Sequence, residues 1–449
     1  MSTAAQTLAK FAAELNFSDI PPAVVERAKD CIINTVGISI FGAQMPWSRM
    51  MTEYARRNGS GGVCSLLGVP DARVHAPYAA LANGLFAHAF ELDCNTEPSF
   101  GAHPGASLVP AILAACEQTN ADGKTAITAF VAGCEVLCRI GTASHHGSSP
   151  IESLGFHAPA ITGPYAAATA AARVYGWNAE QMAHALGIAG SLSSGILAFT
   201  KSRSGAMIKP LHLGRASESG VLAAQLAGLG YTGPETVLEG KFGFLQVFCR
   251  EGDASLLTAG LNKQWYTPSI CIKLYPFHMN AHPPAQTLRE LMAEHKFSGD
   301  QVTGITVEGV HKLSTHHNIL EPGDIGQAQY SVPFCCAFAL YRNPEDPASM
   351  DAGALADPAI RALCRNVEVK LLGDGEGSNK VVRVTVRLKD GRQLVRDGKS
   401  FRGMPSDPLS RADLRYKFML QAKPMGEAGA ARVFERLESL ETQPCFAVA

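Results

Sequence analysis

The feature that most constrains this chain is a long succession of helical patterns, dense in alanine and glycine, that runs from residue 1 to about 266. Residues 159–176 and 213–230 are so rich in small side chains that helix backbones can approach one another closely. A glycine costs about 1 kcal/mol in a solvent-facing helix, so we expect both segments in a crowded interior. Prolines and capping residues mark several helix starts: Pro21 with Pro22, Asp122, and Asn178 with Gln181.

Beyond residue 300 the pattern changes to alternation of apolar and polar residues, which is typical of strands. We expect one strand at 302–310 and an antiparallel hairpin within 380–398, turning at Asp390 and Gly391. Helices are expected beside these strands, with a polar connection between them. The two helices cover 283–296 and 326–342, and the connection covers 343–358.

These changes along the chain predict a mainly α protein with two domains, as its length of 449 residues also favours. Helical periodicity returns from Pro405 onward. We therefore expect a large all-helical domain made of residues 1–266 together with 405–449, and a smaller α+β domain at 267–404.

Composition excludes several classes of protein. The formal net charge is −1 and the pI is near 6.9, so nothing indicates binding to nucleic acid or to an acidic membrane surface. The first residues carry Lys10 and Glu14 within an apolar pattern, unlike a signal peptide, and other apolar runs are interrupted before about 18 residues. The twelve cysteines contain no CxxC pair, and we expect buried reduced thiols, including Cys134 and Cys138. We expect a soluble, cytoplasmic protein.

Histidines beside glycine, proline or carboxylate are the first candidates for chemistry, because imidazole exchanges protons near neutral pH. Asp93 ends an apolar helical run, and His103 follows a glycine-containing loop and directly precedes Pro104 and a new helix. His157 repeats this arrangement ahead of another small-residue helix. A histidine at a helix entrance can bind an anion or act as an acid, although it can also serve only as a cap.

Two lysines and one further histidine complete the candidate set. Lys209 lies in a mostly apolar stretch beside a proline, where it must either extend to water or meet an anion. Lys273 and His278 flank Tyr275 and Pro276 near the expected domain junction, and junctions are favoured ligand sites. His282 follows in the same segment.

Together, these residues suit the binding of a small polyanion during proton transfer. The lysines would neutralise substrate carboxylates, an imidazole would protonate the departing hydroxyl or the carbanion, and a second base would remove the proton beside a carboxylate. Motifs for other chemistry are absent, since GxxxxGK[ST], HExxH and GxSxG do not occur. His316 and His317 lack a carboxylate at zinc-site spacing, and the pair at 145–146 is interpreted as a surface loop.

As a set, these segments resemble the MmgE/PrpD family, which includes 2-methylcitrate dehydratase, cis-aconitate decarboxylase and iminodisuccinate epimerase. The resemblance rests on the order and spacing of five stretches: AHAFELD…HPG at 87–105, GFHAPA at 155–160, MIKPLHLGRAS at 207–217, GYTGPETVLEGKFGF at 230–244 and IKLYPFHMNAH at 272–282. It implies an α+β lid domain inserted into an all-helical domain, a homodimer, and a cleft without metal or organic cofactor. It also implies the site residues Asp93, His103, His157, Lys209, Lys273 and His278.

Two departures from the family pattern bear on the substrate. Many members have a second aspartate where this chain has Cys94. Phe334 stands where decarboxylating relatives have a tyrosine, unless Tyr330 supplies the phenol. We therefore expect a hydro-lyase acting on a citrate-like acid, with His103 as acid and Asp93 or His157 as base. The alternatives are an aconitate-like decarboxylase, an epimerase or isomerase of a dicarboxylate, and a non-catalytic polycarboxylate-binding protein.

Overall fold

The computed structural model describes residues 2–97, 101–144, 151–201, 207–250, 252–373 and 381–448. The histidine pair at 145–146 therefore lies outside the described residues. The chain divides into two compact units, which are described separately. Unit 1 comprises Met1–Ala89, Asp93–Ile272 and Leu414–Ala449, and unit 2 comprises Phe90–Leu92 and Lys273–Asp413. The sequence placed the corresponding changes at 266/267 and 404/405.

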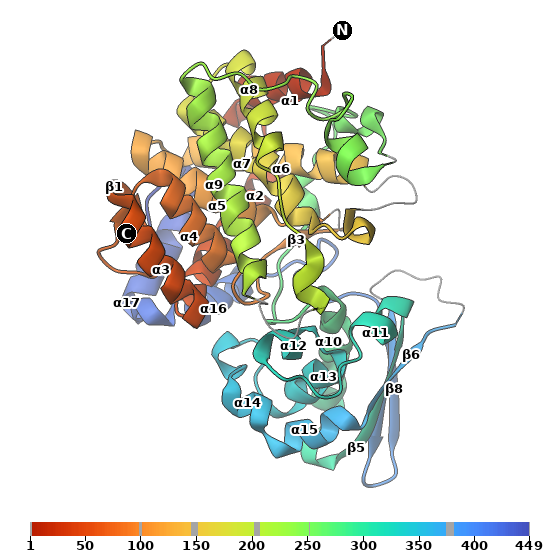
Figure 1. The fold of residues 1–449 in the computed structure, drawn as a ribbon. Coiled ribbons are helices and arrows are strands. Elements are labelled where there is room, and N and C mark those ends of the chain that lie inside the picture. Colours follow the sequence, from red (N-terminus) through yellow and green to blue (C-terminus); the bar gives the residue numbers. More distant parts are fainter. Residues whose placement is uncertain are drawn as a thin grey trace. The chain divides into compact units, whose positions relative to one another are not determined.

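Unit 1 is built mainly from helices, shown in Figure 1. The predicted starts are observed: Pro22 begins α2, Asp122 accepts the N–H of Thr125 at 2.8 Å, and Asn178 and Gln181 form a capping box. The helices are α1 (Ala4–Glu14), α2 (Pro22–Gly42), α3 (Pro46–Gly59), α4 (Ala76–Ala87), α5 (Pro104–Thr119), α6 (Gly123–Ser144), α7 (Ala158–Tyr175), α8 (Ala179–Ser191), α9 (Ile208–Gly228), α16 (Arg411–Gln421) and α17 (Glu427–Glu438).

Close approach between α4, α7 and α9 forms the centre of unit 1. A Cβ added at Gly214 in α9 would lie 2.4 Å from the carbonyl oxygen of Leu81 in α4. A Cβ added at Gly220 would lie 2.3 Å from the Cβ of Ala167 in α7. Both distances are far below van der Waals contact, so only glycine fits at these crossings. The predicted crowded interior is confirmed for both small-residue helices.

Helix α6 is the one described helix that is long and apolar enough to span a membrane by length and composition. Of that stretch, 94% is buried inside the protein, as expected for a core helix. Its charges are paired internally: Arg139 donates to Glu135 at 2.6 Å, and the N–H groups of Tyr266 and Thr267 donate to the other Glu135 oxygen at 2.8 and 2.9 Å. One such buried helix is weak evidence for a membrane protein.

Unit 1 also contains short strands, so the prediction of an all-helical domain is wrong in this respect. Antiparallel pairs form between β1 (Ser60–Ser65) and β2 (Arg73–Val74), and between β3 (Asn95–Thr96) and β4 (Ile270–Cys271). These segments are too short for periodicity to reveal. The β3–β4 pair joins the residues after Asp93 to those before Ile272.

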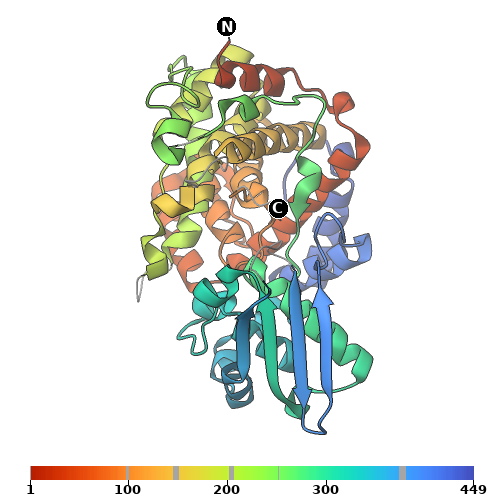
Figure 2. The same ribbon diagram turned by 90° about the vertical axis from the view of Figure 1, so that its right-hand side faces the viewer.

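Unit 2 contains a four-stranded sheet with the order β6–β5–β7–β8 (Figure 2). The predicted strand and hairpin are confirmed as β5 (Val302–Gly309), β7 (Val382–Leu388) and β8 (Gln393–Gly398). Gly391 in the hairpin turn has a φ of 89°, which glycine adopts without strain. Strand β6 (Val367–Leu371), which pairs in parallel with β5, was not predicted.

Helices pack on the sheet of unit 2 and against one another. The helix predicted at 326–342 is instead two helices, because Ser331 is extended and its hydroxyl caps the N–H of Phe334 at 3.0 Å, with Pro333 in the new first turn. The predicted connection at 343–358 contains a short helix. The helices are α10 (His282–His295), α11 (His311–His316), α12 (Ile325–Tyr330), α13 (Val332–Tyr341), α14 (Ala352–Ala356) and α15 (Pro358–Arg365).

Candidate active site

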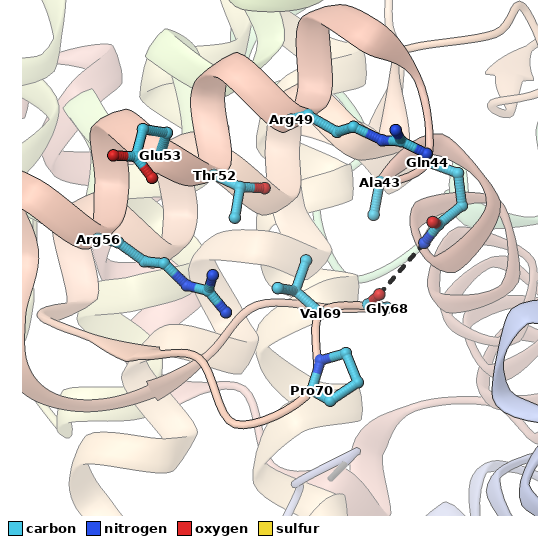
Figure 3. A pocket seen from close by; sticks show the side chains of 9 residues that line it. All are labelled: Ala43, Gln44, Arg49, Thr52, Glu53, Arg56, Gly68, Val69 and Pro70. Carbon is cyan, nitrogen blue, oxygen red and sulfur yellow. Dashed lines mark hydrogen bonds between the residues drawn. The ribbon is translucent and has the colours of Figure 1, made fainter.

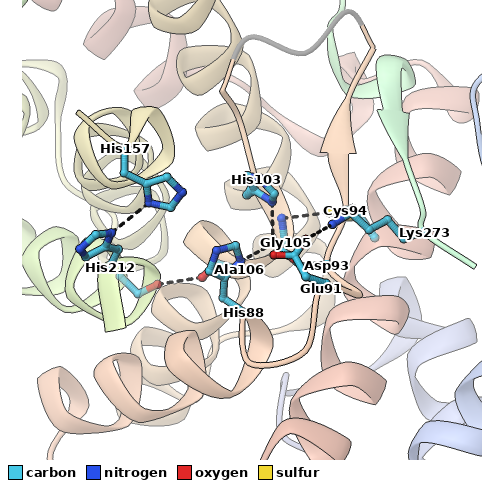
Figure 4. Close-up of polar contacts among 12 residues, drawn as sticks. His88, Glu91, Asp93, Cys94, His103, Gly105, Ala106, His157, His212 and Lys273 are labelled. Atoms are coloured by element: carbon cyan, nitrogen blue, oxygen red, sulfur yellow. Dashed lines mark hydrogen bonds and ion pairs between the residues drawn. The ribbon is translucent and has the colours of Figure 1, made fainter. Parts of the chain in front are cut away.

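The loop after α4 places a buried carboxylate between two imidazoles (Figure 4). One Asp93 oxygen, Oδ2, accepts a hydrogen bond from Nδ1 of His88 at 2.8 Å and another from Nδ1 of His103 at 2.6 Å. The side chains of His88 and Asp93 are fully buried, whereas that of His103 is 18% exposed. His103 therefore lies at the accessible side of this cluster, at the start of α5.

Burial and pairing set the charges in this cluster. Burial disfavours an ionised Asp93, but the adjacent His88 and His103 hold the pKa of its carboxyl well below the usual value. Burial lowers the pKa of His88 to about 3, despite the nearby carboxylate. Asp93 is therefore a buried anion at neutral pH, and His88 is a neutral donor that orients it. His103 is oriented by the same oxygen.

A second imidazole pair lies in unit 1, at the starts of α7 and α9. Nδ1 of His157 lies 3.0 Å from Nδ1 of His212, and both side chains are largely buried. Burial lowers the pKa of both rings. The neighbouring imidazoles, His88 foremost, lower the pKa of His157 further, and Lys209 lowers the pKa of His212 further. The His157 ring is 6.1 Å from that of His88, so the two groups are neighbours.

Lys209 is the second residue of α9 and is partly exposed. Burial is the largest cause of the lowered pKa of His88 and of His212, and the positive charge of Lys209 lowers both pKa values further. The ammonium group of Lys209 therefore interacts electrostatically with the imidazoles of both His88 and His212. Unit 1 thus brings together Asp93, His103, His157 and Lys209.

The other two predicted residues belong to unit 2. Lys273 is 1% exposed, and its Nζ donates to Oε2 of Glu91 at 2.9 Å. The other oxygen of Glu91 accepts the hydroxyl of Tyr330 at 3.2 Å. Glu91 therefore positions an ammonium group and a phenol together, while only Leu92 separates it from Asp93 in the sequence.

His278 lies in a stack of rings in unit 2. Its ring centroid is 4.2 Å from that of His317 and 4.8 Å from that of Tyr330. The N–H of Asn280 points to its Nδ1 at 3.4 Å, which leaves the ring proton on Nε2. His317 donates through Nδ1 to the carbonyl of Tyr330 at 3.1 Å, and burial lowers its pKa to about 4.

Other sequence candidates have structural roles. His282 donates through Nε2 to the carbonyl of Phe277 at 3.2 Å and stacks on Tyr275. His316 is exposed whereas His317 is buried, so these neighbours point in different directions. The described cysteines are free thiols, and all except Cys445 are buried.

The structure distinguishes Phe334 from Tyr330 as the aromatic residue beside the candidate residues of unit 2. Phe334 is fully buried in α13 and stacks against Phe338 with ring centroids 6.2 Å apart. Tyr330, at the end of α12, is the residue whose ring contacts His278 and whose hydroxyl reaches Glu91. The phenol beside the candidate residues of unit 2 therefore comes from Tyr330.

His88, Asp93 and His103 could also be considered as metal ligands, because their donor atoms lie within 4.8 Å of one another. However, a nitrogen that donates a hydrogen bond has no lone pair for a metal. Nδ1 of His88 and Nδ1 of His103 both donate to Oδ2 of Asp93, at 2.8 and 2.6 Å, so neither nitrogen is available to a metal while these hydrogen bonds remain. The geometry therefore favours the hydrogen-bonded cluster over a metal centre.

A separate hollow of about 330 Å³ lies in unit 1 beside α3 (Figure 3). Arg49 and Arg56 border it, and the amide of Gln44 donates to the carbonyl of Gly68 at 3.2 Å. Its lining includes none of the six predicted residues, so we assign it no catalytic role. The lining consists of Ala43, Gln44, Arg49, Thr52, Glu53, Arg56, Gly68, Val69 and Pro70.

Sequence reasoning did not select several residues that hold the candidates in place. These residues are His88, Glu91, His212 and His317. Two of them lie in the same stretch as Asp93, and another follows Lys209 by three positions. For these three residues, proximity to a selected residue along the chain was a signal, although it did not show which contact they make; His317 lies far from any selected residue in the sequence.

A buried carboxylate that holds two imidazoles, with a further imidazole pair beside it, defines a class of protein able to transfer protons. Comparison with known families is more specific. The chain belongs to the MmgE/PrpD family: the N-terminal domain model matches residues 6–257 and the C-terminal domain model matches residues 275–442. The resemblance stated from the sequence is therefore confirmed.

Individual relatives share one activity. Human cis-aconitate decarboxylase is 26% identical over 438 residues, which are 93% of this chain and 88% of that protein. Cis-aconitate decarboxylase of Aspergillus terreus is 30% identical over 321 residues, 69% of this chain and 64% of that protein. Such decarboxylases are lyases, so the prediction of a lyase is confirmed at the level of enzyme class.

Proposed function

We propose that this protein is a lyase that decarboxylates cis-aconitate or a closely related unsaturated tricarboxylate. The observation that carries the proposal is the match to cis-aconitate decarboxylases along nearly the whole chain. It favours the alternative of the sequence analysis over the citrate-like dehydration expected there. The position of Tyr330 supports the change, since the absence of a tyrosine at 334 was the reason to favour dehydration.

The chemistry of this reaction makes clear demands on side chains. When a carboxyl group attached to an allylic carbon leaves as carbon dioxide, the electron pair of the broken bond moves into the double-bond system. The negative charge develops on the far alkene carbon, which carries another carboxylate. A proton must then be added to this far alkene carbon, and the double bond moves to the carbon that lost the carboxyl group. The protein therefore has to bind carboxylates, stabilise an enolate-like anion and supply one proton.

In the proposed reaction, the candidate residues supply the cations and the proton donors that it requires. Lys209 and Lys273 are the cationic groups that bind substrate carboxylates, and Glu91 holds the second ammonium in a defined position. His103, oriented by Asp93 and partly exposed, is a proton donor or acceptor for carbon. Tyr330 and His278 are a second set of proton-bearing groups.

The test is incubation of the purified protein with cis-aconitate, and separately with 2-methylcitrate, in deuterated water. Proton NMR should show a new terminal methylene from cis-aconitate, release of carbon dioxide, and one deuterium on the adjacent saturated carbon. Turnover of 2-methylcitrate to an alkene without carbon dioxide release would instead support the dehydratase. Binding of both acids without turnover would support a non-catalytic role and contradict the proposal.

Tyr330→Phe tests the phenol without removing the ring that stacks on His278. We expect kcat for decarboxylation to fall about 100-fold, the lower range for loss of a general acid or base. Tyr416→Phe, at a side chain on α16 that is 48% exposed, is the matched control and should retain full activity. Equal rates for the two variants would contradict the role assigned to Tyr330.

A further inference from the structure

His157 and His212 are joined through an unusual pair of atoms. The same nitrogen of each ring, Nδ1, faces the other at 3.0 Å. His157 is held at the start of α7, where its backbone N–H donates to the carbonyl of Gly195 at 3.0 Å. His212 comes from α9. The contact therefore joins two helices that are both anchored in the crowded centre of unit 1.

Hydrogen-bond chemistry restricts the protons of this pair. Two Nδ1–H groups would repel each other, and two Nδ1 lone pairs would also repel, so one ring donates and the other accepts. One proton therefore lies between the rings. The remaining nitrogen of His157, Nε2, is then the atom through which this ring can exchange a proton with another molecule.

The surroundings hold both rings in this arrangement. The Phe199 ring packs edge-on against each imidazole, with centroid distances of 5.9 Å to His157 and 5.8 Å to His212. A Cβ on Gly195 would lie 3.4 Å from Nδ1 of His212 and 2.4 Å from the Cβ of Ala160. Glycine at position 195 therefore lets this segment, whose carbonyl accepts from the His157 N–H, approach Ala160 of α7 closely.

We propose that His212 is a positioning residue for His157, which fixes the ring orientation and makes Nε2 of His157 the proton-exchanging nitrogen; its catalytic part rests on the proposed function. When His157 takes up a proton at Nε2, the bridging proton can remain on its Nδ1 or pass to Nδ1 of His212. The positive charge is thereby shared by two rings. When Nε2 gives its proton to carbon, the neutral pair with one bridging proton returns.

Two substitutions at position 212 separate hydrogen bonding from packing. In His212→Asn, the side-chain amide can place an oxygen or a nitrogen near the lost Nδ1, so it can still accept from or donate to His157. In His212→Phe, a ring remains but the partner is lost. We expect His212→Phe to lower kcat about 100-fold with KM changed less than about twofold, and His212→Asn to recover at least about tenfold of that loss.

Phe199→Leu is the packing control, because it alters the contact with both imidazoles and leaves their hydrogen bond in place. We expect it to lower kcat less than His212→Phe does. If Phe199→Leu and both His212 variants lose activity equally, the pair acts only through packing and the proposal is wrong.

A spectroscopic measurement tests the pair independently of any substrate. Nitrogen-15 NMR of histidine-labelled protein, with the His157→Asn variant for assignment, reports which ring nitrogen of His157 carries the proton. We expect its Nδ1 signal to shift on His212→Phe and to move back towards that of the native protein on His212→Asn. An unchanged signal in a folded His212→Phe protein would overturn the proposal. A shifted signal without cis-aconitate turnover would contradict the proposed function alone.

Discussion

At the scale of single residues, burial keeps several histidines neutral. The pKa of His88 is lowered to about 3 and that of His317 to about 4, in both cases mainly by burial. In an unfolded chain the pKa of histidine is about 6.5. Between about pH 6.5 and the lowered pKa, these histidines bind protons in the unfolded chain but not in the folded protein. Their contribution to the free energy of unfolding is therefore fully present above about pH 6.5 and is lost as the pH falls.

His317→Asn should weaken this pH dependence, because asparagine does not titrate and its amide can still donate to the carbonyl of Tyr330. In urea titrations at pH 7 and pH 4.5, we expect the native protein to lose about 2 kcal/mol more than the variant does. His316→Asn, at the exposed neighbour, should follow the native protein. Parallel curves for His317→Asn and native protein would show that this ring does not stay neutral in the fold.

The selection of most candidate residues rested on a local pattern, namely histidine or lysine near glycine or proline, often at a helix entrance. Asp93 with His103 and the position of His157 are examples. Their partners were not predictable in the same way. That His212 meets His157, or that His317 stacks on His278, depends on which helix faces lie together, and no local spacing encodes such contacts.

At the scale of helices and strands, local sequence signals predicted where helices begin better than they predicted where a helix is interrupted. Prolines and capping side chains located α2, α6 and α8. The break at Ser331 was missed, because its apolar surroundings continue the helical pattern on both sides. Strand β6 was missed for a different reason: parallel pairing with β5 depends on a connection of many residues, unlike the hairpin of β7 and β8.

Replacement of Gly214 tests the close approach of α9 and α4. Gly214→Ala places a Cβ against the backbone carbonyl of Leu81, which cannot rotate away, so we expect a loss of about 1–3 kcal/mol in the free energy of unfolding. Gly429→Ala, in α17, would place its Cβ 3.5 Å from the Cβ of Met425, an ordinary contact, and should instead stabilise by up to about 1 kcal/mol. Urea denaturation of both variants measures the difference. The same sign of change at the two sites would refute the packing argument.

At the scale of the whole molecule, the last part of the chain completes unit 1. The ammonium of Lys417 in α16 donates to Oδ1 of Asn34 in α2 at 2.6 Å, and both residues are buried. Phe418 is 1% exposed, and one of its ring carbons would lie 2.9 Å from a Cβ at Gly37. Its ring also contacts Phe434 of α17. These contacts cover α2 with residues from the end of the chain.

Phe418→Ala should therefore destabilise unit 1 by about 3–5 kcal/mol, because it removes a buried ring and leaves a cavity beside α2. Tyr416→Ala, in the same helix at a side chain that is 48% exposed, should cost less than about 1 kcal/mol. Chemical denaturation followed by circular dichroism measures both. Similar midpoints for the two variants would mean that the end of the chain contributes little to the core.

The return of the chain to unit 1 after unit 2 has a consequence for biosynthesis. A ribosome makes α2 early, but its covering residues in α16 and α17 are translated only after unit 2 is complete. The nascent polypeptide must therefore carry an unfinished N-terminal core while the sheet of unit 2 already has all its strands. Closure of the larger unit therefore requires α16 and α17, which follow unit 2 in the chain.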